Sequence, residues 1–373
     1  MGKLNKILTV LCVVFGSFLV LLVFYYVITF TNIPIISTLR DTWIETAMTT
    51  ADHQWLATKF FPKTVVDKIM AKQVTTDDNL ISDPNVVVIA PRSTPTPTPD
   101  FDDETAIDVI APVDIDDDWP KVGDKDEQGN KYIVADKEQD IRIVEIGGFS
   151  LGDGGNYYKG QILFVSDPSR VVVRHTDAKD VRGELMSSYL EKYDAIAGVN
   201  ANGFGDAEGK GTGGLIIGWS IADGKLWGNR ETGLNSASAG FTNDDILVVG
   251  SIKKPQDYPL RDMVQWGPVL IADGKRMISG SAGWGCQPRT AIGQTADGTV
   301  VLVTVDGRQL HSAGITVGEL ADILFSYGVV NACLCDGGSS SVMMYDSAIV
   351  GSVCTPMKTT GRYLPNAILV LRK

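Results

Sequence analysis

The longest apolar stretch of the chain lies close to its first residue. Leu8 to Phe30 form a run of 23 residues without a charged side chain. A helix of that length crosses a hydrocarbon core of about 30 Å. Lys3 and Lys6 precede the run, so residues 1–7 are expected to form a cytoplasmic tail. The run is longer than the apolar part of a signal peptide, about 7–15 residues, and no small-x-small cleavage site follows it. We therefore expect a membrane anchor over residues 8–30, with a cleaved signal peptide as the alternative.

The next stretches differ from the anchor and from each other. Within residues 31–89, large apolar side chains recur at roughly helical spacing between residues 41 and 75, and Pro62 interrupts them. This pattern predicts a juxtamembrane helical region. Residues 90–131 read as a linker, because Thr-Pro repeats favour an extended chain and the acidic residues after them repel one another.

From residue 132 to the C-terminus, short apolar strands alternate with turns. Asp-Gly pairs inside three of these turns predict hairpins. The clearest helix begins at Thr316, where Thr316-Val-Gly-Glu319 forms a capping box, and a shorter helix is expected over residues 183–192. The pattern predicts an α+β domain of mostly antiparallel or mixed sheets with a few helices, preceded by one transmembrane helix. Strands are expected at 141–146, 161–165, 171–174, 195–200, 215–219, 246–249, 269–271, 290–292, 300–305, 329–334 and 367–371.

The net charge of −12 is concentrated in one segment. Between Asp100 and Asp140 there are 15 acidic residues and 4 lysines, a local net charge of −11. The remainder of the chain is close to neutral and has no basic stripe. A nucleic-acid partner is therefore not expected.

The cysteines leave several redox states open. Outside the cytoplasm thiols can oxidise, and Cys286, Cys333, Cys335 and Cys354 lie beyond the expected anchor. Cys333 and Cys335 share one face of a strand, so a bond between them would be strained. Bonds from either one to Cys286 or Cys354, or free thiols throughout, remain open. The Cys-x-Cys pair lacks the further ligands of a zinc site.

The most informative motif runs from Cys335 to Ser341. It follows an apolar strand and places an acid, two glycines and three hydroxyls where that strand ends. Glycine lets backbone N–H groups approach a ligand closely, so Gly337, Gly338, Ser339 and Ser340 suit phosphate or sugar oxygens. An ordinary Asp-Gly turn at Asp336 is the alternative.

Three other segments also place polar groups at expected strand ends. Asn200 and Asn202 offer two amides on one side of a strand. Arg289 opens an apolar strand, where a guanidinium can bind phosphate with two hydrogen bonds. The segment 306–311 combines the carboxylate of Asp306, the guanidinium of Arg308 and the imidazole of His311. Each segment alone also fits a polar turn or a surface ion pair.

In their order along the chain, these motifs resemble the phosphodiester glycosidase family. The resemblance covers about residues 160–373 and departs from the family pattern at Ala201, where a glycine is typical. It implies an enzyme that hydrolyses a sugar-1-phosphodiester to a free sugar and a phosphomonoester. The motifs are Asn200-x-Asn202-Gly-Phe, Gly267-Pro268, Pro288-Arg289-Thr290, Asp306-Gly-Arg308, Gly314-Ile-Thr316, Asp336-Gly-Gly-Ser-Ser and Arg362 with Asn366-Ala367.

The resemblance also implies roles for these residues. A transition state with oxocarbenium character requires a carboxylate near the anomeric carbon, and Asp336 and Asp306 are the candidates. Since a departing phosphate needs little protonation, cationic and N–H contacts can assist it. Phosphate contacts are expected from Arg289, Arg308 and the segment 337–340, sugar or phosphate contacts from Asn200 and Asn202, and a reserve proton donor at His311.

The expected protein is therefore a single-pass cell-membrane enzyme with an extracytoplasmic catalytic domain. Its partners are a glycan or sugar-phosphate substrate and, through residues 8–30, the membrane. No cofactor is required by the sequence, and a structural divalent cation and the oligomeric state stay open. A glycan-binding or envelope-assembly module on the same fold is one alternative, and a sugar-phosphate transferase is another.

Overall fold

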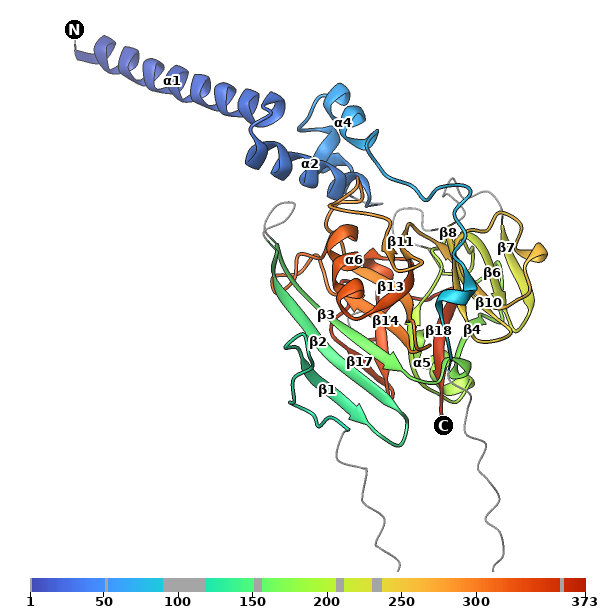
Figure 1. Cartoon of the computed structure of the whole chain (residues 1–373). Helices are drawn as coiled ribbons and strands as arrows, with labels where there is room; N and C mark the ends of the chain where they lie inside the picture. The colour runs from blue at the N-terminus through green and yellow to red at the C-terminus, as the bar shows by residue number, and fades with distance from the viewer. Residues whose placement is uncertain are drawn as a thin grey trace, which may run out of the picture.

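The structure is a computed structural model that describes residues 2–50, 53–89, 119–150, 156–205, 211–229, 237–355 and 359–373. Most of the expected linker, residues 90–118, lies outside the described residues. In the described part of the chain, an N-terminal group of helices precedes a body built from three β-sheets (Figure 1).

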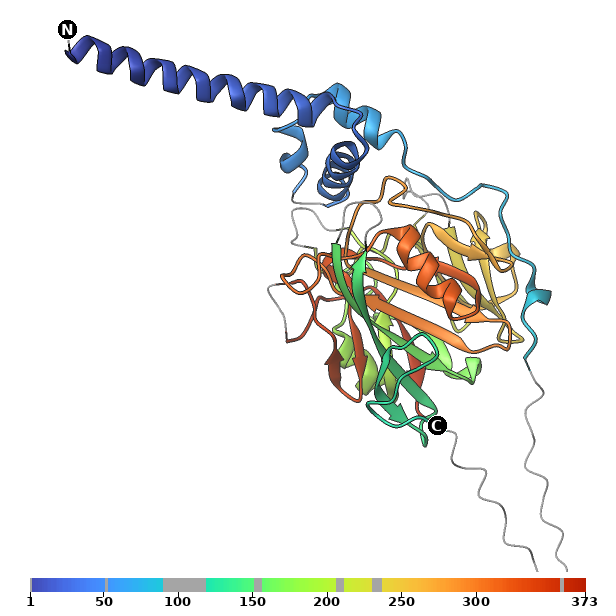
Figure 2. The ribbon, with the colours of Figure 1, turned by 60° about the vertical axis from the view of Figure 1, so that its left-hand side comes forward.

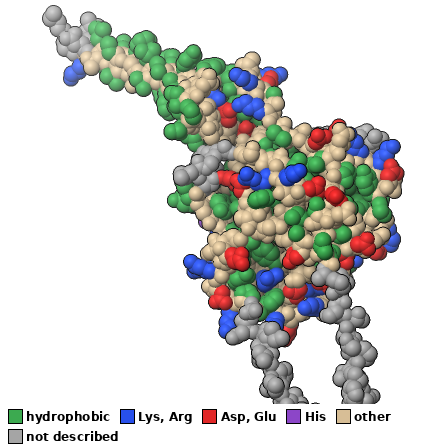
Figure 3. Space-filling model, viewed as in Figure 1, with side chains coloured by type: hydrophobic (Ala, Val, Ile, Leu, Met, Phe, Trp, Pro, Cys, Tyr) green, Lys and Arg blue, Asp and Glu red, His purple; other side chains and the backbone are tan. Residues whose placement is uncertain are grey.

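The first helix, α1 (Gly2–Phe30), projects away from the body, and apolar side chains cover it in Figure 3. Its segment from Lys6 to Phe30 is long and apolar enough to cross a membrane. The helix ends against α2 (Pro34–Met48), where Nη1 of Arg40 donates to the carbonyl oxygens of Thr29 and Thr31 at 3.1 and 3.0 Å. These bonds satisfy carbonyls that the end of a helix would otherwise leave without a partner.

Three further helices form a small cluster between α1 and the body (Figure 2). Helix α2 packs with α3 (Trp55–Thr58) and α4 (Lys63–Met70) around buried Ile44, Ala57 and Ile69. The expected helical region is therefore present up to Met70.

After α4 the chain becomes extended, although the expected juxtamembrane helical region ran to residue 89; its helical periodicity ended near residue 75. Residues 74–89, which we call the strap, run along the body and bond to its strand edges. Ser82 exchanges two hydrogen bonds of 2.8 Å with Val249, and the N–H of Val88 donates to the carbonyl oxygen of Ala296 at 2.8 Å. These contacts satisfy backbone groups that an edge strand would otherwise leave without protein partners.

The body contains one sheet of eight strands and two sheets of five. In every strand pair that the structure describes, the two strands are antiparallel, so the expected α+β class is confirmed. The large sheet has the order β1 (Lys131–Asp136), β2 (Ile141–Ser150), β3 (Asn156–Val165), β14 (Val300–Val305), β13 (Arg289–Thr295), β15 (Val329–Leu334), β11 (Val269–Ala272) and β12 (Lys275–Arg276). The second sheet is β7 (Lys225–Asn229), β6 (Gly218–Ala222), β10 (Leu260–Trp266), β8 (Ala237–Thr242) and β9 (Leu247–Ser251). The third is β17 (Ala348–Val350), β16 (Met343–Tyr345), β5 (Ala195–Asn200), β18 (Asn366–Leu371) and β4 (Val171–His175).

The central strands of the large sheet are buried on both faces. Along β14, Val300 and Leu302 join one hydrophobic cluster, whereas Val301 and Val303 join the other. Side chains alternate between the faces of a strand, so a strand covered on both sides reads as a continuous apolar run. Helix α6 (Val317–Ser326), which begins with the expected capping box, contributes to the second cluster. Helix α5 (Met186–Lys192) packs against β5 and β18 of the third sheet.

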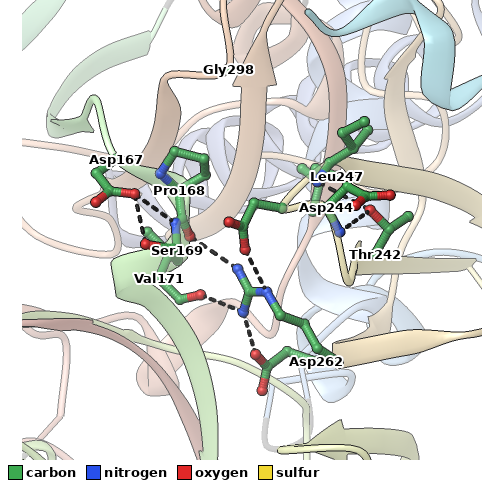
Figure 4. A network of polar contacts seen from close by, with 12 residues as sticks. Asp167, Pro168, Ser169, Val171, Thr242, Asp244, Leu247, Asp262 and Gly298 are labelled. Atoms are coloured by element: carbon green, nitrogen blue, oxygen red, sulfur yellow. Dashed lines mark hydrogen bonds and ion pairs between the residues drawn. The ribbon is translucent and has the colours of Figure 1, made fainter. Parts of the chain in front are cut away.

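A partly buried ion-pair network joins the second and third sheets (Figure 4). Arg261 on β10 pairs with Asp262 and Asp245 and donates to the carbonyl oxygens of Pro168 and Val171 at 2.9 and 2.8 Å. Burial raises the pKa of Asp262, and the neighbouring Arg261 opposes that rise. These contacts therefore hold the second and third sheets together.

Candidate active site

The polar strand ends meet at one edge of the large sheet. Arg289, the first residue of β13, pairs with Val305, the last residue of β14, so Asp306 follows at the same edge. Strand β15 runs alongside β13 and ends just before the motif at Asp336. The N–H of Asp336 donates to the carbonyl oxygen of Ala201 at 2.8 Å, which brings the end of β5 to this point. Strand pairing and this bond thus collect segments that lie up to 136 residues apart in the sequence.

Glycines let the loops at this edge approach one another. A Cβ at Gly307 would lie 2.6 Å from the nitrogen of Pro288, and one at Gly337 would lie 2.7 Å from its carbonyl oxygen. The N–H of Gly338 donates to the same oxygen at 3.0 Å, and the N–H of Gly337 donates to Oδ1 of Asp336 at 3.0 Å. These N–H groups were expected to face a ligand. In the structure the N–H of Gly338 links its loop to Pro288, whereas the N–H of Gly337 bonds within its own loop.

Two arginines contact the short turn Gly338–Ser340. Nη2 of Arg308 would lie 3.2 Å from a Cβ built at Gly338, so its guanidinium rests against that residue. Nη1 of Arg362 donates to Oγ of Ser339 at 3.1 Å, and its guanidinium lies 4.6 Å from the ring centre of Phe204. Two guanidinium groups beside one hydroxyl-bearing turn suit the oxygens of a phosphate. Arg362 belongs to the motif series but was not among the expected phosphate ligands.

The two candidate carboxylates differ in their surroundings. Asp306 is 5 % exposed and accepts hydrogen bonds from N–H and Oγ of Ser352 at 3.1 and 3.0 Å. Its Oδ2 also lies 3.0 Å from Nε2 of His311, whose side chain is 44 % exposed. Asp336 is only half-buried. Asp306 is therefore placed to orient the imidazole, and Asp336 is the more accessible carboxylate.

The cluster of Asp306, His311 and Ser352 is not a nucleophilic triad. Nε2 of His311 faces both the carboxylate and Oγ of Ser352, at 3.0 and 3.2 Å. A triad requires the carboxylate on one ring nitrogen and the hydroxyl on the other. Ser352 has no sequence motif around it, so only the folded chain reveals its place.

The two asparagines serve the framework. Asn200 is fully buried; its Nδ2 donates to the carbonyl oxygen of Asp336 at 2.7 Å, and its Oδ1 accepts from Thr290 and from the N–H of Val342. Asn202 is also fully buried, and its Nδ2 donates to carbonyl oxygens of Ile217, Trp219 and Gln265. Both amides were expected to contact substrate, but protein groups occupy their donors.

Arg289 is likewise turned to the protein interior. Its side chain donates to the carbonyl oxygens of Trp284, Gly285 and Ile315 at 2.8, 2.9 and 3.3 Å. Burial, together with a smaller effect of the neighbouring Arg308, lowers the pKa of Arg289 to about 10. Arg289 therefore shapes the loop before β13, and the structure shows none of these hydrogen bonds going to the Gly338–Ser340 turn.

The sequence profile of one family covers the region that holds these groups. Residues 193–371 match the phosphodiester glycosidase family. This part of the chain therefore carries the sequence pattern of that family. The resemblance inferred from the ordered motifs is thereby confirmed, and the three-sheet body, residues 119–373, is called the glycosidase domain below, after the family that it resembles.

Individual relatives cover limited parts of both sequences. The SPbeta prophage-derived uncharacterized protein YomE of Bacillus subtilis is 30% identical over 181 residues, which are 46% of this chain and 27% of that protein. The N-acetylglucosamine-1-phosphodiester alpha-N-acetylglucosaminidase of Bos taurus is 28% identical over 137 residues, 31% of this chain and 26% of that protein. The matches thus span about a quarter of the length of these relatives.

A solved structure shares the fold. It is the zebrafish N-acetylglucosamine-1-phosphodiester alpha-N-acetylglucosaminidase catalytic domain auto-inhibited by pro-peptide. The alignment has a TM-score of 0.52 at 21% sequence identity and covers 62% of this chain and 83% of that one.

The helical cluster contacts the glycosidase domain next to Arg308. Gln287 accepts from Nε and Nη2 of Arg308 at 2.9 and 2.6 Å through its Oε1. Its Nε2 donates to the carbonyl oxygen of Thr46 on α2 and to Oγ1 of Thr49, the residue that caps the end of α2, at 2.7 and 3.1 Å. A Cβ at Gly285 would lie 2.4 Å from the nitrogen of Thr46. One buried amide therefore links α2 to a candidate phosphate-binding arginine.

Sulfur and metal chemistry are not apparent among the described residues. All five cysteines are free, so of the alternatives left open the structure has free thiols. Burial raises the pKa of Cys286 to about 12, which keeps its thiol protonated and unreactive. Within the described ranges, no group of three or more His, Cys, Asp or Glu side chains is placed to hold a metal ion.

Proposed function

We propose that this chain is a membrane-anchored, extracytoplasmic phosphodiester glycosidase. It hydrolyses a sugar-1-phosphodiester, similar to a GlcNAc-1-phosphate ester, on cell-surface or extracellular glycans. The observation that carries the proposal is the meeting of Arg308 and Arg362 at the Gly338–Ser340 turn, directly after the accessible Asp336. The family match and the names of the mammalian relatives support the substrate class.

The arrangement assigns a role to each group. The two guanidinium groups and the hydroxyl of Ser339 bind the phosphate and stabilise the charge that it gains as it leaves. The carboxylate of Asp336 acts at the anomeric carbon, as nucleophile or as base for water. His311, oriented by Asp306, exchanges the proton of the attacking water. Because a phosphate monoester is a good leaving group, no strong acid is needed at its oxygen.

The anchoring part of the proposal rests on α1. Its apolar surface is exposed along the helix, and its length suits a bilayer. Lys3 and Lys6 at its start favour a cytoplasmic N-terminus, which places the glycosidase domain outside the membrane.

The test is product analysis with the purified full-length chain in detergent. The substrate is the methyl phosphodiester of N-acetylglucosamine-1-phosphate, and released sugar is measured. Asp336→Asn should lower kcat at least a thousandfold, and Arg308→Gln by about a hundredfold, in line with the loss of one transition-state contact. Asp244→Asn, an exposed turn residue, is the matched control.

Each alternative function has its own outcome in this assay. Binding without sugar release by the parent protein would indicate a glycan-binding module, and sugar recovered on an added alcohol would indicate a transferase. Unchanged turnover in Asp336→Asn with a retained circular dichroism spectrum would refute the assignment of the carboxylate.

A further inference from the structure

An apolar cavity lies between α2 and the glycosidase domain. It has a volume of about 420 Å³, within the range of about 300–1,000 Å³ that is usual for small-ligand sites. The helical cluster contributes Leu39, Trp43, Ala47 and Leu56 to its wall, and the glycosidase domain contributes Cys286 and Arg308. Leu39 and Trp43 are 51% and 53% exposed. Large apolar side chains that lie together on a surface are usually in contact with a partner or a ligand.

The cavity adjoins the proposed phosphate site through one shared residue. Arg308 lines the cavity, and the same guanidinium rests against Gly338 of the turn that Arg362 also contacts. A ligand whose phosphate lies at Arg308 therefore has an apolar compartment on one side. On the other side it has the turn that follows Asp336.

The cavity also lies close to the end of the membrane helix. Leu39 precedes Arg40, whose guanidinium binds the carbonyl oxygens of Thr29 and Thr31 at the end of α1. Figure 2 shows α2 directly below the end of α1 and above the glycosidase domain. A chain that leaves the bilayer beside α1 meets this cavity first.

We infer that the cavity binds the lipid chain of a lipid-linked sugar phosphodiester. This inference rests on the proposed function and names the group on the far side of the phosphate. Thr42, Thr46, Thr50 and His53 also line the cavity, but most of its wall area is apolar, which suits an alkyl or isoprenoid chain. A polar glycan or a nucleoside would bury hydroxyls and amides there with few partners, which is unfavourable.

The reaction is then a hydrolysis at the sugar side of the phosphate. The oxygen of water bonds to the anomeric carbon, and the bond from that carbon to the phosphate oxygen breaks. The electron pair stays on the phosphate, and the proton of water passes to the Asp336 carboxylate and, by way of the His311 imidazole, to solvent. The products are the free sugar and a lipid phosphate, which remains in the membrane.

The experiment compares two substrates in nanodiscs of phosphatidylcholine with the full-length chain. They are the methyl and the dodecyl phosphodiesters of N-acetylglucosamine-1-phosphate, and the measured quantity is the ratio of their kcat/KM values. The parent should prefer the dodecyl ester at least tenfold. Leu39→Asp, which places a charge in the wall, should lower that ratio at least tenfold, and Thr42→Trp, which fills the space without a charge, should lower it as well.

Ile35→Asp is the matched control, since Ile35 lies on the same helix, is 75% exposed and does not line the cavity. Partition of the dodecyl chain into the bilayer is the same for all variants, so a change in the ratio isolates the cavity. Equal kcat/KM values for the two esters, or a ratio that neither wall variant changes, would overturn the inference. No release from either ester would instead count against the proposed function itself.

Discussion

Replacing Asn200 by alanine should destabilise the glycosidase domain. The side chain is fully buried and bonds to the carbonyl oxygen of Asp336 at 2.7 Å and to the N–H of Val342 at 3.1 Å. Alanine leaves both backbone groups buried without this partner. Each such loss costs about 1–3 kcal/mol, so the free energy of unfolding should fall by about 4 kcal/mol. For a domain of this size that corresponds to a decrease in Tm of about 8–16 °C.

The assay is thermal unfolding of the full-length chain, followed by near-UV circular dichroism. Asn79→Ala in the exposed part of the strap is the matched control and should leave Tm within about 1–2 °C of the parent, as is usual for a surface substitution. Activity should be lost in Asn200→Ala because the carbonyl of Asp336 is no longer held. A protein that melts like the parent and has lost only activity would show that Asn200 contacts substrate, and the framework role would then be wrong.

Two other predictions follow from buried side chains. Burial, aided by the charges of Lys179 and Arg174, lowers the pKa of His175 to about 3, so its neutral form is favoured in the folded state. The unfolded chain binds the proton near pH 6.5, so stability should fall as the pH falls below that value, by about 2 kcal/mol at pH 5. Urea titrations should show a shallower loss in His175→Gln, and parallel curves for the two proteins would contradict the reasoning. Gln287→Met removes both bonds to Arg308 and both to α2, so kcat/KM for the methyl ester should fall at least tenfold. Parent-like kinetics would show that Arg308 does not depend on Gln287 for its position.

The strands with strong local patterns were predictable. The expected segments at 195–200, 300–305 and 329–334 coincide with β5, β14 and β15. Alternation and β-branched content are local properties, so they survive any arrangement of the remaining chain. The expected strand at 215–219 instead begins at Gly218, and Leu215 is 58% exposed. For an apolar residue near a glycine turn, the neighbouring sequence does not indicate whether the residue belongs to the strand or to the turn before it.

The candidate site was predictable as a set of segments but not as a set of contacts. The order of the motifs correctly indicated the family, and the large sheet does bring Asp306, Asp336 and Arg308 to one edge. The direction of each side chain was not accessible. The sequence around an asparagine at a strand end is the same whether its side chain contacts a substrate or a buried carbonyl oxygen.

The sequence by itself determined the long apolar helix at the N-terminus, the turns at Asp-Gly pairs, the capping box at Thr316 and the family pattern of the C-terminal region. Each of these depends on residues within a few positions of one another or on their order. The tertiary structure alone decided that Asn200, Asn202 and Arg289 face the interior, and that Gln287 connects α2 to Arg308. Their partners lie up to about 240 residues away, or in another sheet. Burial and hydrogen bonding are properties of that three-dimensional neighbourhood, and no short segment contains them.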